Sequence, residues 1–167
     1  MGSLYKKRIG RRTETDKRGR ETEMKKYKIG YTTGVFDMFH IGHLNILRKA
    51  KECCDYLIVG VSTDELVESY KHKIPVIPFE ERLAIVRAIR YVDEVVPQTT
   101  MDKFKAWEQL HFDAIFHGDD WKGSAMYNEI ENKLSAVGVD MVFLPHTKGT
   151  SSTMLKDALQ KALAEIR

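Results

Sequence analysis

A ten-residue stretch, 34–43 (GVFDMFHIGH), constrains the fold of this chain more than any other. It follows an apolar, strand-like run at 29–33 and leads directly into a helical pattern at 44–50. The stretch is therefore expected to lie at a strand-to-helix turn. In open α/β sheets, phosphate groups bind at such turns, where the start of the helix offers free backbone N–H groups. The sequence thus predicts an α/β protein with an anion site at this turn.

The residue types of this stretch suit a polyphosphate. Gly34 lets a ligand approach the backbone closely, while His40 and His43, three residues apart at a helix start, can point two imidazoles the same way. A His-x-x-His pair alone more often reflects surface or core packing than a phosphate site. Here the glycine, the preceding strand and the following helix all occur where phosphate binding needs them, so the stretch predicts a polyphosphate site.

The rest of the chain alternates strand-like apolar runs with helical patterns. This alternation predicts a Rossmann-like α/β fold, with an open, mostly parallel five-stranded sheet and helices on both faces, formed by residues 24–167 as one domain. The strands are expected at 28–33, 56–61, 92–96, 113–117 and 139–144, and the helices at 41–53, 79–90, 101–110, 124–137 and beyond 153, with a short helix after 62–65 and a loop at 70–78. Segments 34–43 and 146–153 are expected to meet at the carboxyl ends of neighbouring strands.

The positive charge of the chain belongs to its first 23 residues. This segment contains eight Lys/Arg and four Asp/Glu, whereas the rest of the chain contains 19 Lys/Arg and 20 Asp/Glu. Because it is polar and lacks apolar periodicity, residues 1–23 are expected to form a flexible basic tail, whether as a genuine extension, an upstream start or a cloning remnant. The rest offers no broad basic face, so nucleic-acid binding is not expected.

Membrane, secreted and metal-binding classes are also disfavoured. The sequence has no apolar run of membrane-spanning length and no apolar secretory core at its start, so a cytoplasmic protein without membrane interaction is expected. Cys53 and Cys54 are adjacent, which suits neither an ordinary structural disulfide nor a zinc site. Both cysteines are therefore expected to be reduced.

Four motifs in a fixed order give this chain a family resemblance. The sequence His40-Ile41-Gly42-His43 is followed by RYVDEVV at 90–96, GDDW at 118–121 and TKGTSST at 147–153. In this order they resemble the HxGH nucleotidyltransferases, specifically the cytidylyltransferase branch, and within it the glycerol-3-phosphate cytidylyltransferases, over about residues 25 to 157.

The resemblance implies a reaction and its partners. It implies transfer of CMP from CTP to glycerol 3-phosphate, a small phospho-alcohol, giving CDP-glycerol and pyrophosphate with Mg²⁺ as cofactor. It also implies a homodimer and a role in teichoic acid or capsule synthesis. Since the acceptor phosphate already carries a nucleophilic oxygen, such an enzyme needs alignment and charge neutralisation rather than a covalent nucleophile.

The resemblance further implies roles for individual residues. The implied catalytic residues are His40, His43, Lys71, Lys73 and Arg82. The implied nucleotide-binding residues are Gly34, Val35, Phe36, Asp37, Ile41, Gly42, Asp119, Asp120, Trp121, His146, Thr147, Thr150, Ser151, Ser152 and Thr153. The implied acceptor-binding residues are Lys71, Lys103 and Arg90, and no side chain is expected to ligate the metal directly.

Several of these residues also have plainer interpretations. Charged residues on helices and loops are often simply solvated, and the hydroxyls at 151–153 could serve only as helix N-caps. Asp64 is expected to have a helix-end role, Trp107 a packing role, and Asp93 is expected to position Arg90 or a neighbouring subunit.

One departure from the resemblance leaves the substrates open. His146 stands where the relatives carry an arginine that contributes to nucleotide binding, and a group titrating near neutrality should weaken or reshape that contact. The same chemistry on phosphoethanolamine, phosphocholine or another polyol phosphate, an ATP-using adenylyltransferase, and a non-catalytic nucleotide-binding module remain alternatives.

Overall fold

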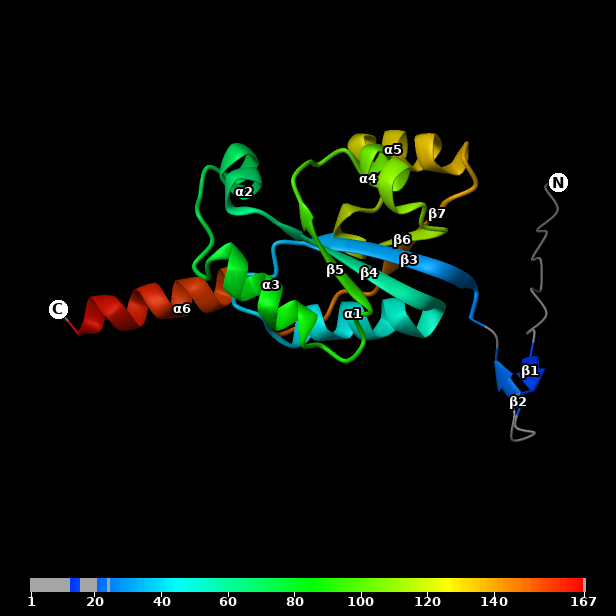
Figure 1. Cartoon of the computed structure of the whole chain (residues 1–167). Helices are drawn as coiled ribbons and strands as arrows, with labels where there is room; N and C mark the ends of the chain where they lie inside the picture. The colour runs from blue at the N-terminus through cyan, green and yellow to red at the C-terminus, as the bar shows by residue number, and fades with distance from the viewer. Residues whose placement is uncertain (1–12, 16–20, 24, 167) are drawn as a thin grey trace, which may run out of the picture.

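The main body of the protein is a five-stranded parallel sheet (Figure 1). The computed structural model describes residues 13–15, 21–23 and 25–166. The strands are β3 (Tyr27–Gly34), β4 (Cys54–Ser62), β5 (Glu94–Gln98), β6 (Ala114–Gly118) and β7 (Asp140–Leu144), in the spatial order β5-β4-β3-β6-β7. Strand order reverses between β3 and β6, and ligands of such sheets bind at the carboxyl ends beside this reversal. The predicted Rossmann-like fold is confirmed.

Helices cover both faces of the sheet, as predicted. The elements are α1 (Ile41–Cys53), α2 (Asp64–Lys71), α3 (Phe79–Arg87), α4 (Lys103–Leu110), the 3₁₀ helix η1 (Asp119–Trp121), α5 (Ala125–Ser135) and α6 (Ser152–Glu165). Helices α1 and α3 pack on one face, while α4 and α5 pack on the other. Helix α6 extends away from the sheet (Figure 1), and none of its residues is buried.

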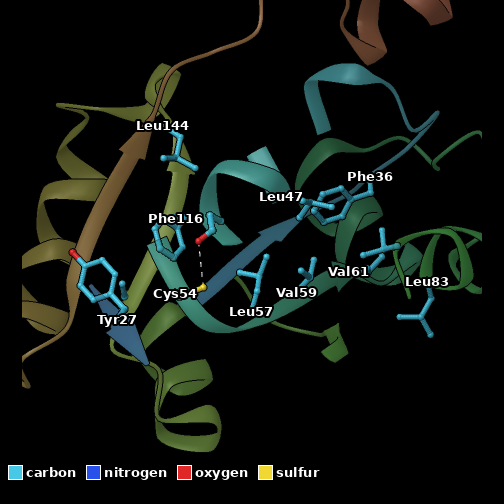
Figure 2. Close-up of a cluster of buried hydrophobic side chains, with 13 residues drawn as sticks. Tyr27, Phe36, Leu47, Cys54, Leu57, Val59, Val61, Leu83, Phe116 and Leu144 are labelled. Atoms are coloured by element: carbon cyan, nitrogen blue, oxygen red, sulfur yellow. Dashed lines mark hydrogen bonds between the residues drawn. The ribbon is translucent and has the colours of Figure 1, made fainter. Parts of the chain in front are cut away.

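The larger core lies between the sheet and the helices α1 and α3 (Figure 2). Leu47 of α1 packs there with Leu57 and Val59 of β4 and with Phe116 of β6, all of them fully buried. Strand β4 is buried on both faces in its second half, which explains its continuous apolar sequence. Cys54 belongs to this core, where its Sγ donates to the Ala50 carbonyl, and both cysteines are free, as expected.

A second core lies under α4 and α5. Tyr31 and Phe112 stack there with their ring centroids 4.8 Å apart, and Ile115 and Leu134 are fully buried beside them. Trp107 packs against this cluster, in agreement with its predicted packing role.

The structure differs from the sequence prediction at several places. Helix α2 extends to Lys71, which was predicted to belong to a loop at 70–78, and α3 ends at Arg87 instead of residue 90. Thr13–Thr15 and Glu21–Glu23 pair as an antiparallel two-stranded sheet, whereas no regular structure was expected there; the other residues of 1–23 lie outside the described part of the chain. Strands β3 and β7 are not neighbours, because β6 lies between them. Strand β5 begins two residues later than predicted and includes Pro97, which an edge strand tolerates.

None of the helices in the described ranges is both long and apolar enough to cross a membrane.

Candidate nucleotide-binding site

The two histidines of the 34–43 turn lie side by side with their imidazole centroids 4.0 Å apart. Nδ1 of His40 accepts from the Gly42 backbone N–H at 3.0 Å, so His40 is the N-cap of α1. Nδ1 of His43 accepts in turn from the His40 backbone N–H at 3.3 Å. A neutral imidazole that accepts at Nδ1 carries its proton on Nε2. Both rings therefore offer an Nε2–H donor to a ligand.

The environment keeps these imidazoles neutral. Burial, assisted by the neighbouring His40, lowers the pKa of His43 to about 4. Burial and the nearby His146 also lower the pKa of His40. Each histidine is therefore a neutral hydrogen-bond donor at pH 7 rather than a fixed positive charge.

Gly42 is required by the geometry of this pair. A Cβ at this position would lie 2.7 Å from Cε1 of His40, and the Thr150 carbonyl lies on the same side at 3.8 Å. Any larger residue would displace the His40 ring from its capping position. This close approach explains the glycine between the two histidines.

Asp37 organises the turn through contacts with three other segments. Its carboxylate accepts from the backbone N–H groups of Val76 and Ile77, both at 2.9 Å, and pairs with Lys156 Nζ at 2.6 Å. Burial raises the pKa of Asp37, but Lys156 and the two N–H groups outweigh that effect and leave it below its ordinary value. Asp37 therefore has a structural role that joins three segments, in addition to the nucleotide contact predicted from the sequence.

The residues beside Asp37 adopt an uncommon backbone conformation. Phe36 and Met38 both lie in the left-handed region, with φ of 54° and 51°. Phe36 is buried and packs its ring 5.4 Å from that of His43. The contacts of Asp37 therefore hold a strained turn in the shape that supports His43.

A variant of Asp37 tests this organising role. Asp37→Asn removes the charge that pairs with Lys156 and loosens segment 76–77, so we expect kcat/KM to fall by about 10- to 10²-fold through misplacement of the phosphate-binding groups. Steady-state kinetics with Asp157→Asn as the matched control measure the effect, because Asp157 is an exposed carboxylate lining the same cavity. Equal activity of both variants and the native protein would contradict the role.

A cavity of about 810 Å³ lies between the loop after α2 and helix α6, next to His43. Its polar lining consists of Asp37, His43, Lys71, Lys73, Ser152, Thr153, Lys156, Asp157 and Gln160. Burial and the nearby Lys156 lower the pKa of Lys71, while Asp37 acts in the opposite direction. The structure thus brings the two predicted loop lysines together with His43 in one cationic cavity.

The loop before α6 meets the histidine turn, as the sequence analysis expected. Ser152 Oγ donates to the Asp37 carbonyl at 2.9 Å and lies 3.4 Å from Nε2 of His40. Ser151 is the N-cap of α6 and accepts from the Met154 N–H. Thr147 Oγ1 accepts from Asn45 of α1 at 3.0 Å. The capping interpretation therefore holds for Ser151, whereas Ser152 lies at the histidines.

A second polar group lies where β6 and β7 end. The His146 backbone N–H donates to Asp119 at 3.1 Å, and His146 Nδ1 lies 3.3 Å from Asp120. All three side chains are exposed. The two aspartates are thus arranged around His146.

Two other predicted nucleotide-binding residues belong to the histidine turn or directly follow it. The Val35 carbonyl accepts a hydrogen bond from Arg82, and Ile41 is the exposed first residue of α1. Trp121 lies elsewhere along the chain, at the end of η1.

Arg82 differs from the expectation of a catalytic cation. It is only 1% exposed, and its guanidinium donates to the carbonyls of Val35, Ser62 and Ile77 and pairs with Asp64. All these partners belong to the protein, so Arg82 stabilises both the histidine turn, through Val35, and the loop before α3, through Ile77. Asp64 is in the first turn of α2, as predicted, and this ion pair is a role that its position alone did not indicate.

Arg90 and Asp93 also differ from expectation. Arg90 stacks on Tyr91, with 5.0 Å from its Cζ to the ring centroid. Asp93 accepts from the Leu57 backbone N–H at 2.7 Å and pairs with Lys51, in place of the expected contact with Arg90. This region precedes β5, away from the carboxyl ends of the strands. Within one chain, Arg90 therefore does not belong to the site.

Lys103 is the first residue of α4, on the face of the sheet opposite to α1. It is 4% exposed and donates from Nζ to Thr33 Oγ1 at 2.9 Å, directly before Gly34. His117, near the end of β6, is also buried and was not among the predicted site residues. The sequence could have indicated His117, because it is a polar residue that ends an apolar strand and directly precedes Gly118.

The burial of His117 predicts how the free energy of unfolding changes with pH. Burial, together with Lys103, lowers its pKa to about 3, below the unfolded value near 6.5. The unfolded state therefore binds more protons below pH 6.5, so this contribution is present above that pH and is lost as pH falls. We expect native protein to lose about 3 kcal/mol more unfolding free energy than His117→Gln between pH 7 and pH 4. Urea unfolding of both proteins measures this difference, and parallel pH curves would contradict it.

Within the described ranges, no group of three or more His, Cys, Asp or Glu side chains could hold a metal ion.

Comparison with known proteins places these observations in a family. A family model described as cytidylyltransferase-like matches residues 31–158. Glycerol-3-phosphate cytidylyltransferase of Bacillus subtilis (strain 168) is 38% identical over 135 residues, covering 77% of this chain and 94% of that protein. Ethanolamine-phosphate cytidylyltransferase of Arabidopsis thaliana is 42% identical over 95 residues, covering 54% of this chain but only 22% of that protein.

A solved structure shows the same fold. The lipopolysaccharide core biosynthesis protein from Thermoplasma volcanium GSS1 superposes with a TM-score of 0.62 at 27% identity, covering 74% of this chain and 99% of that one.

Proposed function

Because this chain belongs to the cytidylyltransferase-like family, we propose that it transfers the cytidylyl group of CTP to glycerol 3-phosphate, giving CDP-glycerol and pyrophosphate. The observation that carries the proposal is the fixed pair of Nε2–H donors on His40 and His43 beside a cavity lined by lysines. Neutral donors and lysine cations together suit a triphosphate whose charge shifts during the reaction.

The reaction needs no covalent enzyme intermediate. An oxygen of the acceptor phosphate attacks the α-phosphorus of CTP, and the bond from that phosphorus to the β-phosphate oxygen breaks. Negative charge then grows on the departing pyrophosphate. His40 and His43 would donate hydrogen bonds to it, while Lys71 and Lys73 would neutralise its charge.

Magnesium is proposed to enter with the nucleotide. The carboxylate of Asp37 is already occupied by Lys156 and two backbone N–H groups. Oxygen ligands for Mg²⁺ would therefore come from the phosphates themselves, and the ion would offset their charge.

The remaining nucleotide contacts are proposed for the second polar group. Asp119, Asp120 and His146 would contact the ribose or base, and Thr147 and Thr150 the phosphates. Because His146 is exposed and already close to Asp120, it could reorient toward a ligand. The contact of His146 with the nucleotide would be weaker than that of an arginine.

Nucleotide and acceptor screening tests the proposed function. The protein is incubated with Mg²⁺, each of the four ribonucleoside triphosphates and sn-glycerol 3-phosphate, and pyrophosphate release is measured. CTP is expected to support turnover selectively. Preference for ATP would instead indicate an adenylyltransferase, and CTP binding without pyrophosphate release from any acceptor would indicate a non-catalytic module.

A second acceptor class is favoured by one comparison. The 42% identity with an ethanolamine-phosphate cytidylyltransferase makes phosphoethanolamine the first alternative to test.

The cellular context follows from the same resemblance and is also a proposal. A cytoplasmic homodimer would supply CDP-glycerol for a surface polymer such as teichoic acid or capsule. Light scattering of the purified protein tests the dimer, with a monomeric mass as the contrary result.

A further inference from the structure

A third lysine, outside the sequence motifs, lines the cavity next to His43. Lys156 lies in α6, one helical turn after Ser152, and its Nζ pairs with the Asp37 carboxylate at 2.6 Å. That carboxylate also accepts from two backbone N–H groups and is almost fully buried, so its position is fixed. The ammonium group of Lys156 is therefore held at one point of the cavity wall.

The ion pair with Asp37 leaves part of this ammonium group free for a ligand. A lysine ammonium has three N–H donors, and within the described ranges Asp37 is the only ion-pair partner of Lys156. The Lys156 side chain is 36% exposed, whereas that of Asp37 is only 3% exposed. Since Lys156 lines the cavity, its remaining donors are available to a molecule bound there.

The charges of this cavity suit a ligand with several negative charges. The cavity lies where the loop after α2 approaches α6 (Figure 1), and its charged lining consists of Lys71, Lys73, Lys156, Asp37 and Asp157. Lys156 is close enough to Lys71 to act with burial in lowering the pKa of Lys71. Like charges held together in this way repel each other, and a bound polyanion would offset that repulsion.

The position of Lys156 relative to the histidines indicates which part of a nucleotide it would meet. His146 is near enough to His40 to lower the pKa of His40, whereas His43 and Lys156 line the cavity. If the nucleoside lies at His146, as proposed above, the phosphate chain runs past the two histidines into this cavity. Lys156 then faces the outer phosphates, which leave as pyrophosphate.

We propose that Lys156 is a further phosphate-binding residue, which Asp37 fixes in the cavity wall and which binds the pyrophosphate portion of the nucleotide. The inference rests on the proposed function and adds to its site a residue that no motif contains. Because Asp37 holds the ammonium in place beforehand, little side-chain entropy is lost when a phosphate binds. The same contact exists in bound CTP and in bound pyrophosphate, so it acts on the affinity for both.

Equilibrium binding of two probes tests this role without requiring turnover. Inorganic tripolyphosphate represents the phosphate chain, and CMP represents the nucleoside with its α-phosphate. By titration calorimetry with Mg²⁺ present, Lys156→Met is expected to bind tripolyphosphate about 10- to 10²-fold more weakly than the native protein, with CMP binding within about twofold. Lys161→Met is the control, because Lys161 is an exposed lysine of the same helix, and it should bind both probes as the native protein does.

A double variant separates phosphate binding from simple neutralisation of Asp37. In Asp37→Asn the charge that Lys156 neutralises is absent, so a lysine with that role alone would no longer affect binding. In the Asp37→Asn background, we still expect Lys156→Met to weaken tripolyphosphate binding by at least about fivefold. Urea unfolding of each variant establishes that the compared proteins are folded.

Three results would overturn the role of Lys156. They are native binding of tripolyphosphate by Lys156→Met, an effect that disappears in the Asp37→Asn background, and an equal loss of tripolyphosphate and CMP binding, which indicates general distortion of the site. None of them depends on turnover. The proposed function fails by a different result, the absence of pyrophosphate release from CTP with every acceptor.

Discussion

Replacing His43 by alanine is expected to lower kcat by about 10²- to 10³-fold while changing the KM for CTP much less. The reason is the fixed tautomer. Because Nδ1 of His43 accepts from the His40 backbone N–H, its Nε2–H is directed to a ligand before any substrate binds. A donor held in place acts mainly on charge that develops in the transition state, whereas one neutral ground-state hydrogen bond contributes only about 1 kcal/mol.

Steady-state kinetics and equilibrium CTP binding measure this effect together. His111→Asn is the control, because His111 is an exposed histidine whose left-handed conformation asparagine tolerates. A change confined to KM, with native kcat, would contradict the transition-state role of His43.

The second large effect concerns stability. Arg82→Met is expected to reduce the free energy of unfolding by about 3–5 kcal/mol, because it leaves the Asp64 carboxylate unpaired and removes the donor to the carbonyls of Val35, Ser62 and Ile77. Urea unfolding measures the loss. Arg87→Met on the same helix is the control, since Arg87 is exposed, and it should change stability by less than about 0.5 kcal/mol.

This experiment also separates the two roles considered for Arg82. If Arg82→Met were as stable as the native protein but strongly impaired in kcat, the guanidinium would act on phosphate directly. If loss of stability is the main effect, Arg82 has a structural role in which its buried guanidinium stabilises the turn.

The fold could be predicted closely because its signals are local. The sequence of β4 is a continuous apolar run because both faces of its second half are buried. Helix α1 begins at Ile41, where the histidine motif predicts a helix. The neighbours of β3 could not be predicted equally well. Parallel strands connected by long crossovers leave no local sign of their spatial order, so the insertion of β6 between β3 and β7 required the structure.

The candidate site was predicted in part for a similar reason. His40, His43, Lys71 and Ser152 could be recognised because motifs preserve their order along the chain, and the structure brings them together. What motifs do not show is whether a polar side chain faces a ligand or the protein. Asp37 was predicted to contact the nucleotide, and its ion pair with Lys156 could not be predicted from the motif.

Residues outside the motifs were harder to find. Lys156 lies four residues after Ser152, on the same side of α6, so helical spacing could have indicated it. His117 depends on burial from both a strand and a helix, and its unpaired Nε2 is visible only in three dimensions.

The most direct test of the account is the product of the reaction with labelled acceptor. The protein, CTP and Mg²⁺ are incubated with sn-glycerol 3-phosphate carrying ¹⁸O in its terminal phosphate oxygens, and the products are identified by mass spectrometry. The account predicts CDP-glycerol that retains the label and pyrophosphate that carries none, in equal amounts, because the acceptor oxygen attacks the α-phosphorus. Unlabelled CMP as the only nucleotide product, or pyrophosphate that carries the label, would contradict it.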